Sequence, residues 1–354
     1  MDLERRVDLV VRHSAELLTL EEIRALFERS DRPRAYIGFE PSGRLHVGHL
    51  VTARKMLDLV DAGFDLTLFL ADWHAWINDK LGGSLERIDE AGRYMAAAFG
   101  AVGLTADRVR VRWARELVGR ADYWSRVVRI AKATSLARTK RAMTVLGRSE
   151  EEATLDTAKL FYPSMQAADI FELPVDLAYA GLDQRRAHVL AREVAHHYGW
   201  PVPVALHTSL VSSLKGGGRM DPTEGGVERK MSKSDPASAI ALPSSPGEIE
   251  AKLAAAFCPA KEVDGNPVVE LARFVVFAWE GTLAVERPAK FGGNVTYETE
   301  SSFLDAYRKG ALHPQDLKRS VGQALVRITE PATEYFRQHP EAVPSAAGAP
   351  APVT

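Results

Sequence analysis

The sequence lacks several features that would assign it at once to particular classes of protein. Its 354 residues include a single cysteine, Cys258, which excludes an internal disulfide and any metal site built from several cysteines. It contains no uninterrupted apolar run long enough to cross a bilayer, and its first residues do not form a charged segment followed by an apolar one. These absences predict a soluble, cytoplasmic protein.

An excess of positive charge is also missing. Lys and Arg together number 45 and Asp and Glu 47, so the formal net charge is −2 and any contact with a nucleic acid must use a local patch. The best candidate is residues 132–148, whose basic residues have almost no acidic neighbours: Lys132, Arg138, Lys140, Arg141 and Arg148. Composition alone favours a solvated helix face for this stretch.

The chain is long enough, and at 46% apolar enough, for two domains with hydrophobic cores. Five short segments read as strands separated by helical periodicity: residues 35–39, 65–72, 109–114, 175–181 and 202–207. This alternation predicts an α/β fold with a doubly wound parallel sheet, in which ligands bind beyond the carboxyl ends of the strands. Residues 3–30 carry apolar residues at helical spacing and predict an amphipathic N-terminal layer.

After residue 240 the sequence changes character. Segments 244–257, 266–277 and 313–329 have helical periodicity and capping Ser, Pro or Asp residues, and they predict a separate helical domain at 245–338. Residues 339–354 have too little bulky apolar content to pack, so we predict a disordered tail.

Two short motifs carry most of the chemical information. HVGH places His46 and His49 three residues apart before an apolar-periodic run, which predicts two imidazoles on one face at a helix N-terminus. Phosphate is favoured there, and Gly48 lets a nucleotide approach the backbone. In KMSKS, at 230–234, Lys230 and Lys233 follow a segment with the composition of a mobile loop. Alone, either motif could be a solvated surface segment; together they predict a split site for the triphosphate of ATP.

Three polar residues are predicted to share one stripe of a helix that Pro163 is suited to begin: Tyr162, Gln166 and Asp169. A carboxylate among apolar neighbours is costly unless a polar partner arrives. A tyrosine phenol is such a partner, because it can donate to Asp169 and accept from Tyr36, while Gln184 can help to hold the ammonium group. Spacing alone leaves open that Asp169 caps a local element and that Tyr162 belongs to the core.

The two motifs resemble those of the class I aminoacyl-tRNA synthetases. Several separated segments are similar to the tyrosyl-tRNA synthetases of the archaeal and eukaryotic type: AYIGFEPSGRLHVGH (35–49), FLADWHAWIND (69–79), FYPSMQAADI (161–170), AGLDQRRAH (180–188), RPAKFGG (287–293) and LHPQDLK (312–318). The resemblance covers most of residues 20–335. It implies a Rossmann-like catalytic domain at 1–240, with a connective insertion at about 105–155 and a KMSKS loop at 215–236, followed by an α-helical anticodon-binding domain at 245–338.

The resemblance also implies an activity. The enzyme would activate L-tyrosine with ATP and Mg²⁺ to tyrosyl-adenylate and transfer the tyrosyl group to the 3′ end of tRNA(Tyr), as a homodimer without membrane attachment. The implied catalytic residues are His46, His49, Lys230 and Lys233. The implied ATP-binding residues are Gly38, Glu40, Gly48, Asp183, Met231, Ser232 and Ser234. The implied tyrosine-binding residues are Tyr36, Tyr162, Gln166, Asp169 and Gln184.

For tRNA, the implied contacts are Arg138, Lys140, Arg141, Arg185, Phe291, His313 and Asp316. Phe291 could stack on an unpaired base and Asp316 could accept from a guanine edge. The competing interpretations are a core aromatic for Phe291 and a helix N-cap for Asp316.

Other functions remain open from the sequence. A tryptophanyl-tRNA synthetase would share the fold, but its substrate has no phenol, so the pairing of Tyr36 with Asp169 would be unexplained. A catalytically retired paralogue should have lost part of HVGH or KMSKS, and both are intact. Phe69 and Trp76 leave open a specialised copy for a modified tyrosine or for inhibitor resistance.

Two histidines also suggest a metal site, but no third ligand lies nearby in sequence, so we predict none. His74 remains unassigned, either a core residue or part of the site.

Overall fold

The structure is a computed structural model that describes residues 1–143, 156–216, 231 and 237–344. The chain divides into two compact units. Unit 1 comprises Met1–Gly43, Lys55–Thr208 and the chain end from Glu341, and unit 2 comprises Arg44–Arg54 and Ser209–Pro340.

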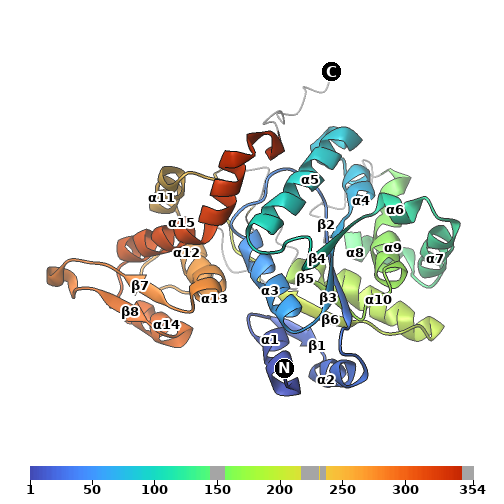
Figure 1. Cartoon of the computed structure of the whole chain (residues 1–354), viewed down its shortest axis with the longest axis horizontal. Coiled ribbons are helices and arrows are strands. Elements are labelled where there is room, and N and C mark those ends of the chain that lie inside the picture. The colour runs from blue at the N-terminus through green and yellow to red at the C-terminus, as the bar shows by residue number, and fades with distance from the viewer. Residues whose placement is uncertain (144–155, 217–230, 232–236, 345–354) are drawn as a thin grey trace. The chain divides into compact units, whose positions relative to one another are not determined.

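Unit 1 is built around a sheet whose described strands run in the order β1-β6-β5-β2-β3-β4 (Figure 1). Five of its strands pair in parallel: β2 (Arg34–Phe39), β3 (Asp65–Leu70), β4 (Val109–Trp113), β5 (Leu177–Gly181) and β6 (Val204–Thr208). The predicted α/β class with a doubly wound parallel sheet is confirmed. Each of these strands lies within a few residues of its predicted segment, because buried parallel strands are short apolar runs between turns.

The N-terminal residues do not form the single helical layer that was predicted. They form α1 (Leu3–Val11), the short strand β1 (Glu16–Leu18) and α2 (Leu20–Arg29). His13 adopts a left-handed φ of 57° just after α1, and β1 then pairs antiparallel with β6. Thr19 and Glu22 form a capping box that starts α2. Periodicity missed β1 because its pairing partner lies far along the chain.

Helices lie on both sides of this sheet: α5 on one side, and α7, α9 and α10 on the other (Figure 1). Their bounds, with those of the shorter helices of unit 1, are α4 (Asp72–Ile77), α5 (Leu85–Ala101), α6 (Arg115–Val118), α7 (Ala121–Lys132), α8 (Leu136–Met143), α9 (Thr157–Glu172) and α10 (Arg185–Tyr198), with 3-10 turns at Lys80–Gly83 and Leu182–Gln184. A core cluster joins the second side to the sheet through buried Tyr36, Phe69, Tyr123, Met165 and Leu190.

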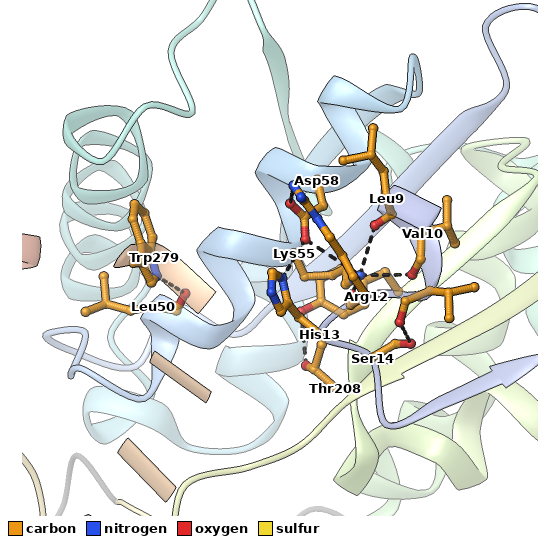
Figure 2. Close-up of polar contacts among 12 residues, drawn as sticks. Leu9, Val10, Arg12, His13, Ser14, Leu50, Lys55, Asp58, Thr208 and Trp279 are labelled. Atoms are coloured by element: carbon orange, nitrogen blue, oxygen red, sulfur yellow. Dashed lines mark hydrogen bonds and ion pairs between the residues drawn. The ribbon is translucent and has the colours of Figure 1, made fainter. Parts of the chain in front are cut away.

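A buried lysine fastens the end of α1 to helix α3 (His49–Asp61). The Lys55 side chain is fully buried, and its Nζ donates to the carbonyl oxygens of Leu9 at 3.2 Å, Val10 at 2.9 Å and Arg12 (Figure 2). These carbonyls lie at the C-terminal end of α1, where a cation is electrostatically favourable. Lys55 therefore supplies the hydrogen bonds that water would otherwise give to the last carbonyl groups of α1, which are buried.

Asp58 neutralises this buried cation. It is itself fully buried, with one carboxylate oxygen 3.8 Å from Lys55 Nζ and 3.0 Å from His13 Nδ1 (Figure 2). Its other oxygen accepts from the Arg12 guanidinium. Buried charges persist in proteins when they are paired and hydrogen-bonded, as these are.

Two glycines of α5 provide a matched test of packing. A Cβ at Gly92 would lie 2.5 Å from the Trp113 ring and 3.3 Å from Pro41, whereas a Cβ at Gly100 would have nothing within 4 Å. We expect Gly92→Ala to destabilise the protein by about 1–3 kcal/mol through overpacking. Gly100→Ala should be neutral or stabilising by up to about 1 kcal/mol, because alanine is the better helix former. Urea unfolding of both variants measures the difference, and equal effects would contradict the packing described.

Unit 2 is mainly helical, as predicted for residues after 240. Its elements are α11 (Pro246–Ala255), α12 (Pro267–Leu271), a π-helical segment at Ala272–Val276, α13 (Phe277–Glu280), β7 (Leu283–Val285), a 3-10 turn at Ala289–Phe291, β8 (Val295–Tyr297), α14 (Glu300–Arg308) and α15 (Pro314–Gln338). Ser245 and Asn266 cap α11 and α12, each followed by proline. The β7–β8 hairpin was not predicted.

Two further observations complete the fold. Trp279 of α13 donates its indole N–H to the Leu50 carbonyl in the first turn of α3, at 3.0 Å (Figure 2). Pro340–Ala342 form a 3-10 turn at the start of the predicted tail, and residues 345–354 of that tail lie outside the described residues. None of the described helices has a stretch both long and apolar enough to span a bilayer.

Candidate active site

Helix α9 carries the three residues predicted to share a stripe. It begins at Thr157, where the Asp156 side chain caps it by accepting from the Lys159 backbone N–H at 3.1 Å. Pro163 therefore lies inside the helix, and the prediction that it starts the helix was wrong, because the capping aspartate comes earlier in the chain. Within α9, Tyr162 and Asp169 are buried and Gln166 is half-buried.

The Asp169 carboxylate is held by two side chains from other helices. Tyr123 of α7 donates its hydroxyl to Oδ1 at 2.9 Å. His74 of α4 places Nε2 3.1 Å from Oδ2, an ion-pair distance without the alignment of an ideal hydrogen bond. Asp169 therefore does not act as a local cap, and that interpretation was wrong. We call Tyr36, His74, Tyr123 and Asp169 the Asp169 cluster.

Burial and mutual charge shift the pKa values within this cluster. Burial raises the pKa of Asp169, and His74 and Tyr123 offset only part of that rise. Burial by itself would lower the pKa of His74, but the Asp169 carboxylate outweighs it and the net shift is upward. The pair thus retains a proton to a higher pH than an isolated histidine would. Burial, and then Asp169, raise the pKa of the Tyr36 phenol, which stays protonated.

A second carboxylate, Glu40, lies beside Tyr162. The Tyr162 hydroxyl donates to Glu40 Oε1 at 2.7 Å, Asn78 Nδ2 donates to the same oxygen at 2.5 Å, and Lys80 Nζ lies 3.5 Å from Oε2. The Tyr162 ring also packs edge-to-face on His74, with centroids 5.0 Å apart. Tyr162 is therefore buried as the core interpretation expected, yet it also belongs to a polar network.

A chain of amide hydrogen bonds connects α9 to the turn after β5. Gln166 Nε2 donates to Gln184 Oε1 at 3.0 Å, and Gln184 Nε2 donates to Asp183 Oδ2 at 3.2 Å. Asp183 and Gln184 follow the carboxyl end of β5 and precede α10, which is the edge of the sheet where ligands bind in this class of fold.

The HVGH residues belong to unit 2 and are arranged differently from the prediction. His46 precedes the helix and forms a β-bridge with Ala241, so the two histidines do not share a helical face; only His49 begins α3. Their rings nevertheless touch, with centroids 4.1 Å apart. His46 Nδ1 accepts from the Gly48 N–H at 3.2 Å, and a Cβ at Gly48 would lie 2.9 Å from that ring. The folded-back imidazole therefore requires glycine at 48.

Met231 connects the second motif to the first. It is buried, its N–H donates to the Val211 carbonyl at 3.1 Å, and its sulfur lies 3.7 Å from the position of a Cβ on Gly48. Met231 thus brings the KMSKS motif next to HVGH within unit 2. The other KMSKS residues lie outside the described residues: Lys230, Ser232, Lys233 and Ser234.

The candidate tRNA residues have varied surroundings. Phe291 is 60% exposed, so it is not a core aromatic. His313, rather than Asp316, caps α15 by accepting from the Gln315 N–H at 3.2 Å, and Asp316 pairs with Arg319 at 2.9 Å. In unit 1, three of the candidates engage neighbours: Arg138 pairs with Glu193 at 3.0 Å, Arg185 with Glu16 at 2.8 Å, and the Arg141 carbonyl accepts from Arg186 at 3.3 Å. Lys140 lies on α8 with Arg138 and Arg141, and Arg148 lies outside the described residues.

Three side chains at the site escaped prediction: His74, Tyr123 and Asn78. His74 was noticed without an assignment, and its place soon after the carboxyl end of β3 was the available signal. Tyr123 lies on α7 and Asn78 in the turn after α4, and neither has a spacing relation to Asp169 or Glu40 that would mark it in the sequence. In the described part of the chain, no group of three or more His, Cys, Asp or Glu residues could hold a metal ion.

Comparison with known proteins decides the family. Residues 28–330 match the family described as tRNA synthetases class I (W and Y). The tyrosine–tRNA ligase of Aeropyrum pernix is 46% identical over 337 residues, covering 94% of this chain and 93% of the relative. This chain belongs to the class I tyrosyl-tRNA synthetases. It is accordingly an aminoacyl-tRNA ligase with ATP as a substrate, and the tryptophanyl alternative was wrong.

Other relatives agree with this placement. The tyrosine–tRNA ligase of Sulfurisphaera tokodaii is 44% identical and covers 96% of this chain and 95% of its own. The crystal structure of the Pyrococcus horikoshii tyrosyl-tRNA synthetase complexed with L-tyrosine superposes with a TM-score of 0.89 at 41% identity, covering 97% of this chain and 98% of that one. This tyrosyl-tRNA synthetase therefore shares the fold of its relatives along nearly its whole length.

Proposed function

We propose that this tyrosyl-tRNA synthetase recognises the phenol of L-tyrosine with Asp169 and Tyr36. The observation that supports the proposal most is a carboxylate buried among apolar residues of α9, whose side-chain polar partners among the described residues come from α4 and α7. An ionised carboxylate accepts up to four hydrogen bonds, so it can accept the substrate phenol in addition to its present partners. A site built for a phenol rejects phenylalanine, because its own polar groups would be left unpaired.

The ammonium group of tyrosine needs several oxygens around three N–H bonds. We assign it to Tyr162, Gln166 and Gln184. The Gln166–Gln184 hydrogen bond supports this assignment, because it aligns two amide groups at the carboxyl end of β5. Both amides can present an oxygen to a cation after a change of hydrogen-bond partner.

For ATP, we assign the phosphates to His46, Gly48, His49 and the KMSKS residues Lys230, Met231, Ser232, Lys233 and Ser234. Gly38, Glu40 and Asp183 are assigned to the adenosine side. Mg²⁺, which proteins usually bind together with substrate phosphates and several waters, would supply charge neutralisation on ATP.

The chemistry follows from these assignments. A tyrosine carboxylate oxygen attacks the α-phosphorus of ATP, the bond from that phosphorus to the β-phosphate oxygen breaks, and pyrophosphate leaves. The terminal ribose hydroxyl of tRNA(Tyr) then attacks the tyrosyl carbonyl carbon, and AMP leaves. Both steps require positioning and stabilisation of phosphate charge rather than a side-chain nucleophile. The histidines and lysines of the two motifs provide that stabilisation.

The remaining assignments concern tRNA and assembly. We propose residues 1–240 as the catalytic domain, with a connective insertion at about 105–155 that contains Arg138, Lys140 and Arg141, and 245–338 as the anticodon-binding domain. The exposure of Phe291 supports a stacking role for its ring on an unpaired base. We also propose tRNA contacts for Arg185, His313 and Asp316, a homodimeric assembly and a cytoplasmic location.

The function predicts tyrosine-dependent exchange of pyrophosphate into ATP in the absence of tRNA, because every residue assigned to adenylate formation precedes residue 235. Lys233→Ala should slow exchange while leaving tyrosine affinity nearly unchanged, since the lysine acts on the transition-state phosphate. Running the assay with tyrosine, tryptophan, phenylalanine and substituted tyrosines also tests the specialised-paralogue alternative. A folded sample without exchange for any of them would refute the proposal.

A further inference from the structure

His74 has no role in the recognition and chemistry proposed above. Its side chain is buried, and its Nε2 lies 3.1 Å from Asp169 Oδ2, while its Nδ1 has no hydrogen-bond partner among the described residues. It is the sole cationic group in contact with Asp169 within the described part of the chain. His74 thus contacts the residue that we assign to the tyrosine phenol.

We propose that His74 is a positioning residue that keeps Asp169 ionised and aims its carboxylate, with Tyr123 as the second support. This inference rests on the proposed role of Asp169. His74 and Tyr123 each contact a different oxygen, so together they fix the rotation of the carboxylate. Each oxygen keeps an acceptor site for the substrate.

The need for such a partner follows from burial. An isolated buried carboxylate favours its protonated form, because the charged form loses its hydration. A protonated Asp169 would offer its own O–H and would no longer be a charged acceptor for the phenol, which weakens the hydrogen bond that distinguishes tyrosine from phenylalanine. His74 opposes this by placing a cationic or hydrogen-bonding imidazole next to the carboxylate.

The neighbouring charges do not replace His74. Among the described residues, the ionisable groups around His74 and Asp169, on their own helices and on the elements packed against them, are Tyr36 on β2, Glu40 after β2, Asp72 on α4, Tyr123 on α7 and Tyr162 on α9. None of them is a cation. Asp72 is engaged by Arg115, with Nε 2.5 Å from Oδ2, and Glu40 by Tyr162 and Asn78. Removal of His74 would therefore leave Asp169 among acids and phenols.

The test is the pH dependence of the KM for tyrosine in the exchange assay. In His74→Leu, we expect KM to rise several-fold more than in wild type as the pH falls from about 8 to about 6, because burial raises the pKa of Asp169 and the variant lacks the main group that opposes this rise. The tyrosine KM of wild type should rise less than that of His74→Leu over the same range, because His74 and Tyr123 favour the charged form of Asp169. The kcat should change much less than KM, because the bond-making groups are elsewhere.

His74→Gln is the conservative control. Its amide can still donate to Asp169, so the pH dependence should be smaller than in His74→Leu. A folded His74→Leu enzyme whose KM does not vary with pH would overturn the proposal. If His74→Leu does not fold, the same measurement is made on His74→Gln and Tyr123→Phe. A tyrosine KM that does not vary with pH in either variant would also overturn the proposal.

Asp169→Asn separates this inference from the proposed function. It should raise the tyrosine KM at every pH and abolish the pH dependence of the His74→Leu background. An unchanged KM in Asp169→Asn would remove Asp169 from tyrosine recognition and the proposed function with it. A raised KM in Asp169→Asn together with a flat His74→Leu profile would overturn only the role of His74.

Discussion

Replacing Asp169 by Ala together with Tyr36 by Leu should lower kcat/KM for tyrosine by about 10²- to 10⁴-fold. Two hydrogen bonds to the phenol would be lost, each worth about 1.5–3 kcal/mol when one partner is charged, and about 1.4 kcal/mol corresponds to a factor of ten. The kcat/KM for para-substituted phenylalanines should rise instead, because the substitutions remove the polar groups that these analogues would leave unpaired and enlarge the space beyond the ring. Pyrophosphate exchange with both kinds of substrate measures the change in preference.

A matched control is available on the neighbouring strand. Tyr179 of β5 is fully buried like Tyr36, but its hydroxyl lies 3.0 Å from the Thr208 hydroxyl. Tyr179→Phe removes a buried tyrosine hydroxyl without touching the Asp169 cluster, so the preference for tyrosine should persist. If the double variant kept the wild-type preference, Asp169 and Tyr36 would not face the substrate.

Replacing Lys55 by Met should destabilise the protein by about 3–5 kcal/mol, the cost typical of removing one partner of a buried charge pair. Methionine can fill the same space, but the carbonyls of Leu9, Val10 and Arg12 would lose their donor and Asp58 would lose a cation at 3.8 Å. Chemical denaturation followed by circular dichroism gives the change in the free energy of unfolding.

Lys318 provides the comparison, because it also donates to a carbonyl near a helix C-terminus, that of Ala254 at 2.8 Å. That hydrogen bond is exposed, so water can replace the ammonium, and Lys318→Met should cost less than about 1 kcal/mol. Similar losses for the two lysines would show that burial of Lys55 contributes nothing.

Two details of the site were predicted incorrectly, and they have different causes. Pro163 suggested a helix start, but Asp156 begins α9 earlier. The spacing of His46 and His49 suggested one helical face, whereas the bridge to Ala241 holds His46 outside the helix while the rings still meet. In both cases the local pattern named the right residues and the wrong geometry. A local side-chain cap by Asp156 decided where α9 begins, and backbone pairing with the distant Ala241 decided the position of His46.

The sequence by itself determined the fold class, the family and the candidate residues of α9. These features depend on short-range periodicity and on motifs whose residues are close along the chain, such as Tyr162, Gln166 and Asp169 on successive turns. Only the tertiary structure decided which groups hold Asp169. His74 and Tyr123 reach it from α4 and α7, and no spacing in the sequence relates them to α9. Burial sets the charge of a carboxylate, and burial exists only once the helices have packed.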